Sequence, residues 1–479
     1  MPISVASTAL VGIEGVPVEV EVDVAPGIPA TRIVGLPDAA VGEARERIRS
    51  AIRAAGYTWP ARRITINLAP ADLRKSGGSF DLAIALGILI ASGQIRRGGG
   101  RSVAAVGELA LDGRVRSVPG AIPLVLPLLV AGHRVFLPNG HPELDASEVG
   151  EPVAVATLAD AAAQVQMASL PPQARHDPET ATEPVDEVGV ELSSIRGQPT
   201  ASRAVLIAAC GRFPILLEGP PGVGKSMLAR ALHQILPDLS TEERSEVAAI
   251  SSAAGLTRGS SLRPPLRAPH HDLTVAGLIG GGPRLSPGEL TWAHRGLLLL
   301  DEIGEFRRDA LEALREPLER GWVDLVRAGR SVRFPADAIV AATGNPCGCG
   351  ELEYPSGACR CLPASRRRGS LSLSAPIRDR FPVRLRLARP SAPLAALPPG
   401  EWTTARARAT ATGVRDALRE RRSRPRPSRT QWHGGAEGLG ARAWAQVEQI
   451  ALVVALLDGR ESVSETDRAE ALHLHGDRW

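Results

Sequence analysis

Short stretches of alternating apolar and polar residues mark the first third of the chain. They cover residues 18–24, 63–68 and 103–106, and residues 43–55 carry apolar side chains at helical spacing. A period of two predicts strands with one buried face, whereas a period near 3.6 predicts an amphipathic helix. The pattern therefore predicts an α+β domain over residues 1–170.

The pattern changes twice in the rest of the chain. Residues 171–189 are rich in Pro, Glu and Ala, which is typical of a linker. Residues 190–390 alternate strands, loops and helices, so they predict an α/β domain with a parallel sheet. Residues 391–479 predict a small helical domain that is shortened and irregular over 391–438. The arginine-rich run 415–429 favours a solvated connector, with DNA contact as the alternative.

A glycine-rich loop joins an apolar strand over residues 214–218 to a helix predicted over 226–235. Glycines let backbone N–H groups approach phosphates, and a helix N-terminus favours an anion. Lys225 would reach the β- and γ-phosphates of a nucleotide, and Ser226 would bind Mg²⁺. The loop matches the GxxxxGK[ST] pattern with Gly219, Pro220, Pro221, Gly222, Val223, Gly224, Lys225 and Ser226.

Two further apolar stretches end in polar residues of the kind that completes such a site. Leucines 297–300 run directly into Asp301 and Glu302. Asp301 would assist Mg²⁺ binding, and Glu302 would polarise an attacking water. A third strand, predicted over 336–343, ends just before Asn345. Its amide would orient the same water, or it is a turn-forming asparagine before Pro346.

Composition narrows the range of functions. The chain of 479 residues is 44% hydrophobic and 23% charged, as in soluble globular proteins. No apolar stretch reaches the ~20 residues of a membrane span, and no signal peptide is visible, so we expect a cytoplasmic protein without a membrane partner. The net charge of +4 permits nucleic-acid binding without requiring it.

Four of the five cysteines cluster in one segment, as Cys347, Cys349, Cys359 and Cys361. Two close pairs of thiolates predict a Zn²⁺ site, with ordinary thiols or a redox pair as the alternatives.

Residues 322–334 predict a hairpin around Ala328-Gly329. It carries Arg327, Arg330 and Arg333. These arginines would neutralise nucleic-acid phosphates without reading sequence, or they are the charged edges of a solvated hairpin.

Together with the markers that follow, these motifs make the chain resemble the magnesium-chelatase-like ComM (YifB) family of AAA+ ATPases. The markers are Gly197-Gln198, Pro269-His270-His271, Gly280-Gly281-Gly282, Pro287-Gly288-Glu289, Ala293-His294, Arg315-Glu316-Pro317-Leu318-Glu319 and Asn345-Pro346-Cys347-Gly348-Cys349-Gly350. The resemblance implies an AAA+ core with a helical lid, and a hexamer that uses ATP and Mg²⁺ to move single-stranded or branched DNA. Branch migration in recombination or natural transformation, alongside recombination proteins, is the implied setting.

The same resemblance assigns roles to single residues. Asn345 is implied to be the first sensor, and Arg442 the second. Arg380, in Pro376-Ile377-Arg378-Asp379-Arg380-Phe381, is implied to be the finger that enters the neighbouring subunit's site. The hairpin would point into the pore of the ring. Two alternatives stay open: a chelatase-type motor that remodels a protein partner, and an inactive structural ring component.

The first domain is similar to the Lon-protease-like domain. Ser79 occupies the place of the nucleophilic serine in that domain. The place of the catalytic lysine falls on Pro123, which has no side-chain amine to activate Ser79. We therefore expect no peptidase activity, and a scaffold role in ring assembly or DNA contact instead.

Overall fold

The computed structural model forms two compact units, which we describe separately. The first consists of Met1–Pro184 with Arg244–Ser261, and the second of Val185–Glu243 with Leu262–Trp479. The structure describes residues 2–36, 39–73, 75, 77–98, 102–139, 152–167, 189–255, 261–282, 285–327, 330–347, 349, 359–362, 373–390, 392–423 and 439–476.

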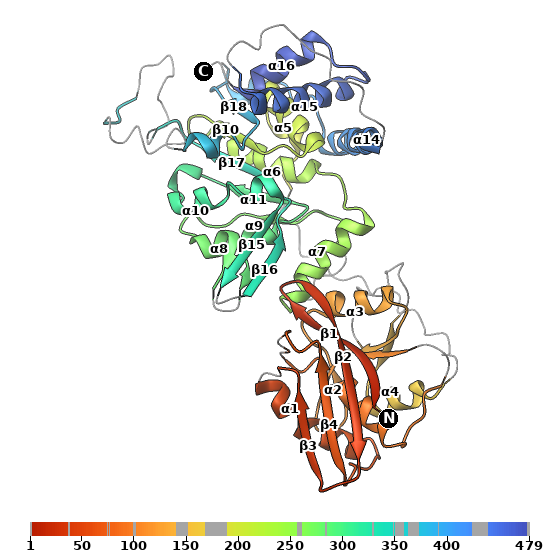
Figure 1. The fold of residues 1–479 in the computed structure, drawn as a ribbon. Helices are drawn as coiled ribbons and strands as arrows, with labels where there is room; N and C mark the ends of the chain where they lie inside the picture. Colours follow the sequence, from red (N-terminus) through yellow and green to blue (C-terminus); the bar gives the residue numbers. More distant parts are fainter. Residues whose placement is uncertain are drawn as a thin grey trace. The chain divides into compact units, whose positions relative to one another are not determined.

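A mixed sheet forms the centre of the first unit (Figure 1). In spatial order its strands are β3 (Ala30–Val34), β4 (Arg63–Ala69), β2 (Glu14–Ala25), β1 (Ile3–Val11), β5 (Val103–Ala105), β8 (Arg134–Pro138) and β9 (Val153–Val155). β2 pairs antiparallel with β1 and β4, and the other neighbours are parallel. A small separate pair is formed by β6 (Glu108–Leu109) and β7 (Val115–Arg116). The three predicted strands are therefore confirmed in β2, β4 and β5.

The described part of this unit also contains the helices α1 (Ala39–Ala54), α2 (Asp81–Ala91), α3 (Ala121–Val130) and α4 (Leu158–Val165). α1 confirms the predicted amphipathic helix. α2 is buried along most of its length, including Leu82 and Ile84, which explains why its sequence is apolar on every side. Residues 244–255, within and after α7 (Thr241–Ala253), also belong here, because the Ser252 carbonyl accepts a 2.7 Å hydrogen bond from the Gly120 N–H.

The structure shows the surroundings of Ser79 and Pro123, the residues on which the predicted absence of peptidase activity rests. Ser79 is 7% exposed, and Pro123 is buried inside α3. The fully buried Lys75 donates a hydrogen bond to the Pro70 carbonyl. The absence of peptidase activity stays a prediction.

The second unit is built around a parallel five-stranded sheet. Its order is β11 (Leu266–Arg267), β14 (Leu297–Leu300), β17 (Ile339–Gly344), β10 (Ile215–Glu218) and β18 (Val383–Arg386). All residues of β14 and β17 are buried, as expected for a sheet covered on both faces. The predicted strands over 214–218 and 297–300 are confirmed. The third begins at Ile339 rather than 336, because residues 336–338 form a turn in which the Ala338 N–H donates to the Ala336 carbonyl.

Helices surround this sheet (Figure 1). The longer ones are α5 (Pro199–Gly211), α6 (Lys225–Ile235), α14 (Thr404–Ser423), α15 (Ala441–Leu457) and α16 (Glu465–His475). Shorter elements are α8 (Val275–Ile279), β12 (Gly280–Gly281), β13 (Ser286–Pro287), α9 (Glu289–Trp292), α10 (Arg308–Ala313), α11 (Pro317–Arg320), β15 (Trp322–Arg327), β16 (Arg330–Pro335) and α13 (Ala375–Arg378). Ser464 and Asp467 form a capping box at the N-terminus of α16.

The expectation of a solvated connector over 415–429 is wrong for the part that the structure describes, because α14 continues to Ser423. Ala407, Ala411 and Val414 lie one helical turn apart and join the core of this unit. Arg415 is buried against Glu243, with which it forms an ion pair. The buried face of α14 therefore consists mainly of small apolar side chains and one paired arginine. Residues 424–438 lie outside the described part.

In the described part of the chain, every helix is too short or too polar to cross a membrane.

Candidate nucleotide site, hairpin and cysteine cluster

The three sequence motifs meet at one edge of the parallel sheet. β17 lies between β14 and β10, with Leu300 opposite Ala342 and Glu218 opposite Gly344. Each strand therefore ends beside its neighbour, and the carboxyl ends lead into Gly219, Asp301 and Asn345. Ligands of open parallel sheets bind at this edge.

The glycine-rich loop between β10 and α6 has the backbone of a phosphate cradle. Gly222 and Gly224 have φ values of 81° and 95°, in the left-handed region that favours glycine. A Cβ atom at either position would meet no atom within 4 Å, so the backbone angle and not crowding requires glycine. Gly224 directly precedes α6, a helix of 11 residues whose N-terminus faces the loop. This arrangement fits a bound phosphate.

Lys225 connects the loop to β17. Its amine donates to the carbonyl oxygens of Gly219 and Pro220, both at 2.8 Å, and to Asn345 Oδ1 at 3.0 Å. Burial lowers the pKa of this amine, and the nearby Asp301 and Glu302 oppose that shift. The ammonium therefore lies among the residues that the sequence singled out.

Asp301 joins the helix to the strands. Its Oδ1 accepts hydrogen bonds from Ser226 Oγ at 2.9 Å and from Thr343 Oγ1. A hydroxyl and a carboxylate are oxygen ligands of the kind that Mg²⁺ takes, so the pair fits the predicted ion. Sequence reasoning missed Thr343. Its signal was a hydroxyl at the end of an otherwise apolar strand.

Glu302 has an unusual backbone. Its φ is 55° and its ψ 52°, a left-handed conformation that non-glycine residues seldom adopt. The Glu302 N–H donates to Thr343 Oγ1 at 3.1 Å, which holds the turn after β14 in place, and the side chain is exposed. Backbone strain of this kind tends to gather at functional sites.

Arg380 and Arg442 both form ion pairs with Glu319. The sequence analysis named Glu319 only within a family motif and gave it no role. Arg380 Nη2 lies 2.6 Å from Glu319 Oε2, and Arg442 Nη2 lies 3.5 Å from Glu319 Oε1. Burial lowers the pKa of Arg380, and the charge of Arg442 lowers it further. The acidic partner of Arg380 is thus Glu319, rather than its neighbour Asp379. The finger and sensor roles stay predictions.

The predicted hairpin is formed by β15 and β16, which pair antiparallel from Trp322–Pro335 to Arg327–Arg330. Arg333 Nε donates to Asp324 Oδ1 at 2.7 Å, and its guanidinium lies 4.7 Å from the centre of the Trp322 ring. Arg327, the last residue of β15, is exposed. The side chain of Arg330 lies outside the described part.

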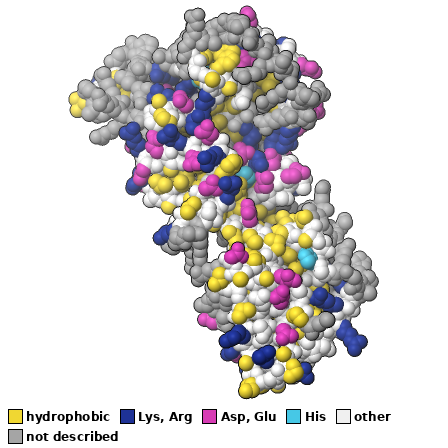
Figure 2. All heavy atoms as spheres, viewed as in Figure 1, with side chains coloured by type: hydrophobic (Ala, Val, Ile, Leu, Met, Phe, Trp, Pro, Cys, Tyr) yellow, Lys and Arg dark blue, Asp and Glu magenta, His cyan; other side chains and the backbone are white. Residues whose placement is uncertain are grey.

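On the face in Figure 2, basic and acidic side chains are interspersed over the second unit. A charge pattern of this kind does not by itself mark a nucleic-acid surface, so the case for DNA contact rests on the hairpin.

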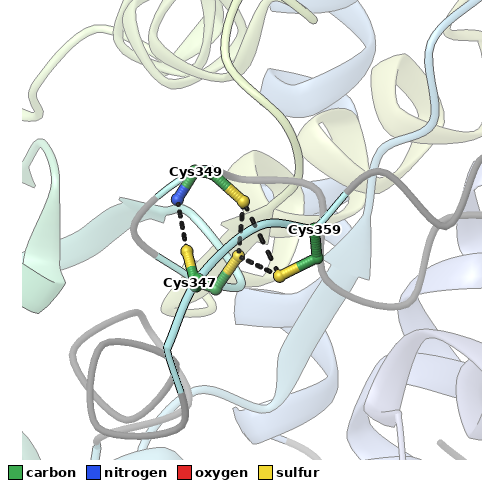
Figure 3. A group of neighbouring side chains, drawn as sticks. Cys347, Cys349 and Cys359 are labelled. Atoms are coloured by element: carbon green, nitrogen blue, oxygen red, sulfur yellow. Dashed lines mark hydrogen bonds between the residues drawn. The ribbon is translucent and has the colours of Figure 1, made fainter.

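The four clustered cysteines come together in space. Their sulfur atoms all lie within 4.8 Å of one another, and Figure 3 shows three of the side chains converging. This cluster could hold Zn²⁺. Cys210 differs from these four, because it is buried in α5 as part of the core, and burial raises its pKa to about 12.

Comparisons with known proteins agree with this architecture. A family model described as "Magnesium chelatase, subunit ChlI" matches residues 191–393, and one described as "Subunit ChlI of Mg-chelatase" matches residues 20–141. The chain is 36% identical to the uncharacterized protein YifB of Escherichia coli, over 98% of this chain and 97% of that protein.

Two further relatives extend the comparison. The competence protein ComM of Haemophilus influenzae is 34% identical over 98% of this chain and 96% of its own. The magnesium-chelatase 38 kDa subunit of Cereibacter sphaeroides is 28% identical over 32% of this chain and 52% of its own. Full-length similarity at this identity, together with the parallel sheet and its phosphate loop, shows that the chain belongs to the ComM/YifB family of magnesium-chelatase-like AAA+ ATPases.

Proposed function

We propose that the protein is an ATP-hydrolysing ring motor that acts on DNA. The observation that carries the ATPase part is the convergence of Lys225, Ser226, Asp301 and Asn345 at one sheet edge. Lys225 would neutralise the β- and γ-phosphates. Ser226 and Asp301 would hold Mg²⁺, which supplies charge neutralisation when bound.

Glu302 and Asn345 are the residues proposed to act on water. The carboxylate of Glu302 would accept a proton from the attacking water, and the Asn345 amide would orient that water. Thr343 would act through its two neighbours, since its hydroxyl donates to Asp301 and accepts from the Glu302 N–H.

The ring part of the proposal rests on Arg380. The Arg380 side chain is only 11% exposed, but it pairs with Glu319, whose side chain is 52% exposed, so the pair reaches the surface of the unit. An arginine there would enter the site of a neighbouring subunit, as expected in a hexamer.

DNA is the proposed substrate for two reasons. One relative over nearly the full length is a competence protein, and the hairpin strands carry the exposed Arg327 and Arg333. A second function, remodelling of a protein partner, is favoured by the family descriptions that name magnesium chelatase.

The steady-state ATPase rate separates these functions. We expect single-stranded, duplex or four-way-junction DNA to stimulate the rate at low salt, less so at high salt, because phosphate contacts weaken as salt rises. Lys225→Ala should abolish turnover with and without DNA. A robust rate that no DNA changes would contradict the DNA motor and favour the protein-remodelling one. Absence of turnover in the unaltered protein would favour a structural ring component.

The hairpin arginines should contribute unequally to DNA binding. Arg327→Ala should weaken binding to single-stranded DNA and reduce the slope of log K against log salt by about 0.7, the value for one phosphate contact. Arg333→Ala should have a smaller effect, since Asp324 already neutralises this guanidinium. Titration by fluorescence anisotropy at several salt concentrations measures both.

Arg307→Ala is the matched control for the hairpin variants, because Arg307 is an exposed arginine already paired with Asp309. Equal effects of Arg327→Ala and Arg307→Ala would show that the hairpin does not contact DNA.

A further inference from the structure

The distances between the sulfur atoms of the cysteine cluster distinguish a disulfide from a metal site. Cys347 Sγ lies 3.4 Å from Cys349 Sγ and 3.7 Å from Cys359 Sγ, and the last two sulfurs are 3.7 Å apart. A disulfide would need a separation of about 2.05 Å. A tetrahedral ion with Zn–S bonds of about 2.3 Å places its sulfurs about 3.8 Å apart. Two of these three separations lie within about 0.1 Å of the edge of a zinc tetrahedron, and the third is about 0.4 Å shorter.

The fourth cysteine completes the ligand set. The Cys349 N–H donates to Cys361 Sγ at 3.2 Å, and all four sulfurs lie within 4.8 Å of one another. An amide that donates to sulfur stabilises a thiolate and orients it, as partners of metal ligands do. Cys347 is fully buried. Four thiols this close together, one of them shielded from water, are better satisfied as thiolates around a cation than as neutral groups with weak hydrogen bonds.

The position of the cluster links it to the nucleotide site. Asn345 directly follows β17, Cys347 lies two residues further along the chain, and the intervening Pro346 is buried. Asn345 Oδ1 accepts a hydrogen bond from Lys225. An ion bound by Cys347 would anchor the chain on the far side of Asn345, while β17 anchors the near side.

We propose that Cys347, Cys349, Cys359 and Cys361 bind one structural Zn²⁺, and that this ion positions Asn345. The site is closed, because four protein ligands leave no position for water or substrate. Zinc therefore takes no part in the hydrolytic step. The claim that the ion positions Asn345 rests on the proposed ATPase function, whereas the claim that the four cysteines bind zinc does not depend on that function.

Metal content tests the site by itself. Full-length protein, purified under reducing conditions and dialysed, should contain about one zinc per subunit. Cys359→Ser and Cys361→Ser should each lower that content to near zero, and Cys210→Ala, the matched control in α5, should retain it. Zinc near zero in the unaltered protein, with the cluster thiols open to a thiol reagent, would overturn the proposal. Stoichiometric iron in place of zinc would overturn it too.

A second measurement covers the case in which the variants fail to fold. Cobalt exchanged into the unaltered protein should show the intense visible absorption of a tetrahedral thiolate site, which added Zn²⁺ should remove. Absence of that absorption would contradict the ligand set. Neither measurement needs ATP or DNA. The zinc-site proposal can therefore hold even if the proposed motor function fails.

The positioning role predicts a split between binding and turnover. Cys359→Ser should lower kcat for ATP by about 10- to 100-fold, because a small displacement of a positioning group has effects of this size. Its Kd for ATP should change little, since the phosphate loop stays whole. In the Asn345→Ala background, the same substitution should cause little further loss. Normal kcat in a zinc-free Cys359→Ser protein, or additive losses in the double variant, would refute the positioning role.

Discussion

Replacing Glu302 by glutamine is expected to lower kcat for ATP hydrolysis by about 10²- to 10⁴-fold, the usual contribution of a general base. The amide keeps the size of the side chain but cannot accept a proton from water. ATP affinity should be nearly unchanged, because Lys225, Ser226 and Asp301 keep their mutual contacts. Steady-state turnover, together with equilibrium binding of a fluorescent ATP analogue, measures the two quantities separately.

Glu305→Gln is the matched control for this variant. Glu305 is an exposed glutamate three residues further along, in the short helical turn Ile303–Glu305. Its replacement removes the same charge and should leave kcat unchanged. If Glu302→Gln kept more than about a tenth of the rate, or lost ATP binding in parallel with turnover, Glu302 would not be the base.

Replacing Arg380 by alanine should reduce kcat by about 10³- to 10⁵-fold, the range that arginine fingers contribute. The fold should tolerate the change, because Glu319 is 52% exposed and water can solvate its carboxylate once the arginine is removed. A thermal melt checks the fold, and steady-state turnover checks the rate. Arg307→Ala, which removes an exposed arginine elsewhere in the unit, should keep full turnover.

Mixing two inactive variants tests whether Arg380 acts on a neighbouring subunit. An Arg380→Ala subunit keeps its own Glu302, and a Glu302→Gln subunit keeps its own Arg380. In a ring assembled at random from equal amounts, about a quarter of the interfaces would combine both intact residues. Turnover should therefore recover in part on mixing. No recovery in rings shown to be mixed would mean that Arg380 acts within its own subunit, or not at all.

Local sequence was sufficient for the elements that carry chemistry. β14 coincides with the predicted strand, and the hairpin strands flank the predicted turn. A glycine-rich loop and a leucine run are readable because each is continuous in the chain. The helix α14 could not be predicted from local sequence, because its buried face consists largely of alanines. Its one buried arginine pairs with Glu243, which is 172 residues away in the chain. Helical periodicity cannot reveal a partner at that distance.

Sequence by itself determined the phosphate loop, the acidic pair after β14 and the fold class of both units, because these depend on residues that are adjacent in the chain. Only the tertiary structure decided which residues meet. It brought Asn345 into hydrogen-bond contact with Lys225, which is 120 residues away in the chain, and Thr343 into contact with Asp301. It also brought Arg380 and Arg442 to the same glutamate, Glu319. The physical reason is that parallel strand order and helix packing bring side chains together, and neither is written in any one segment.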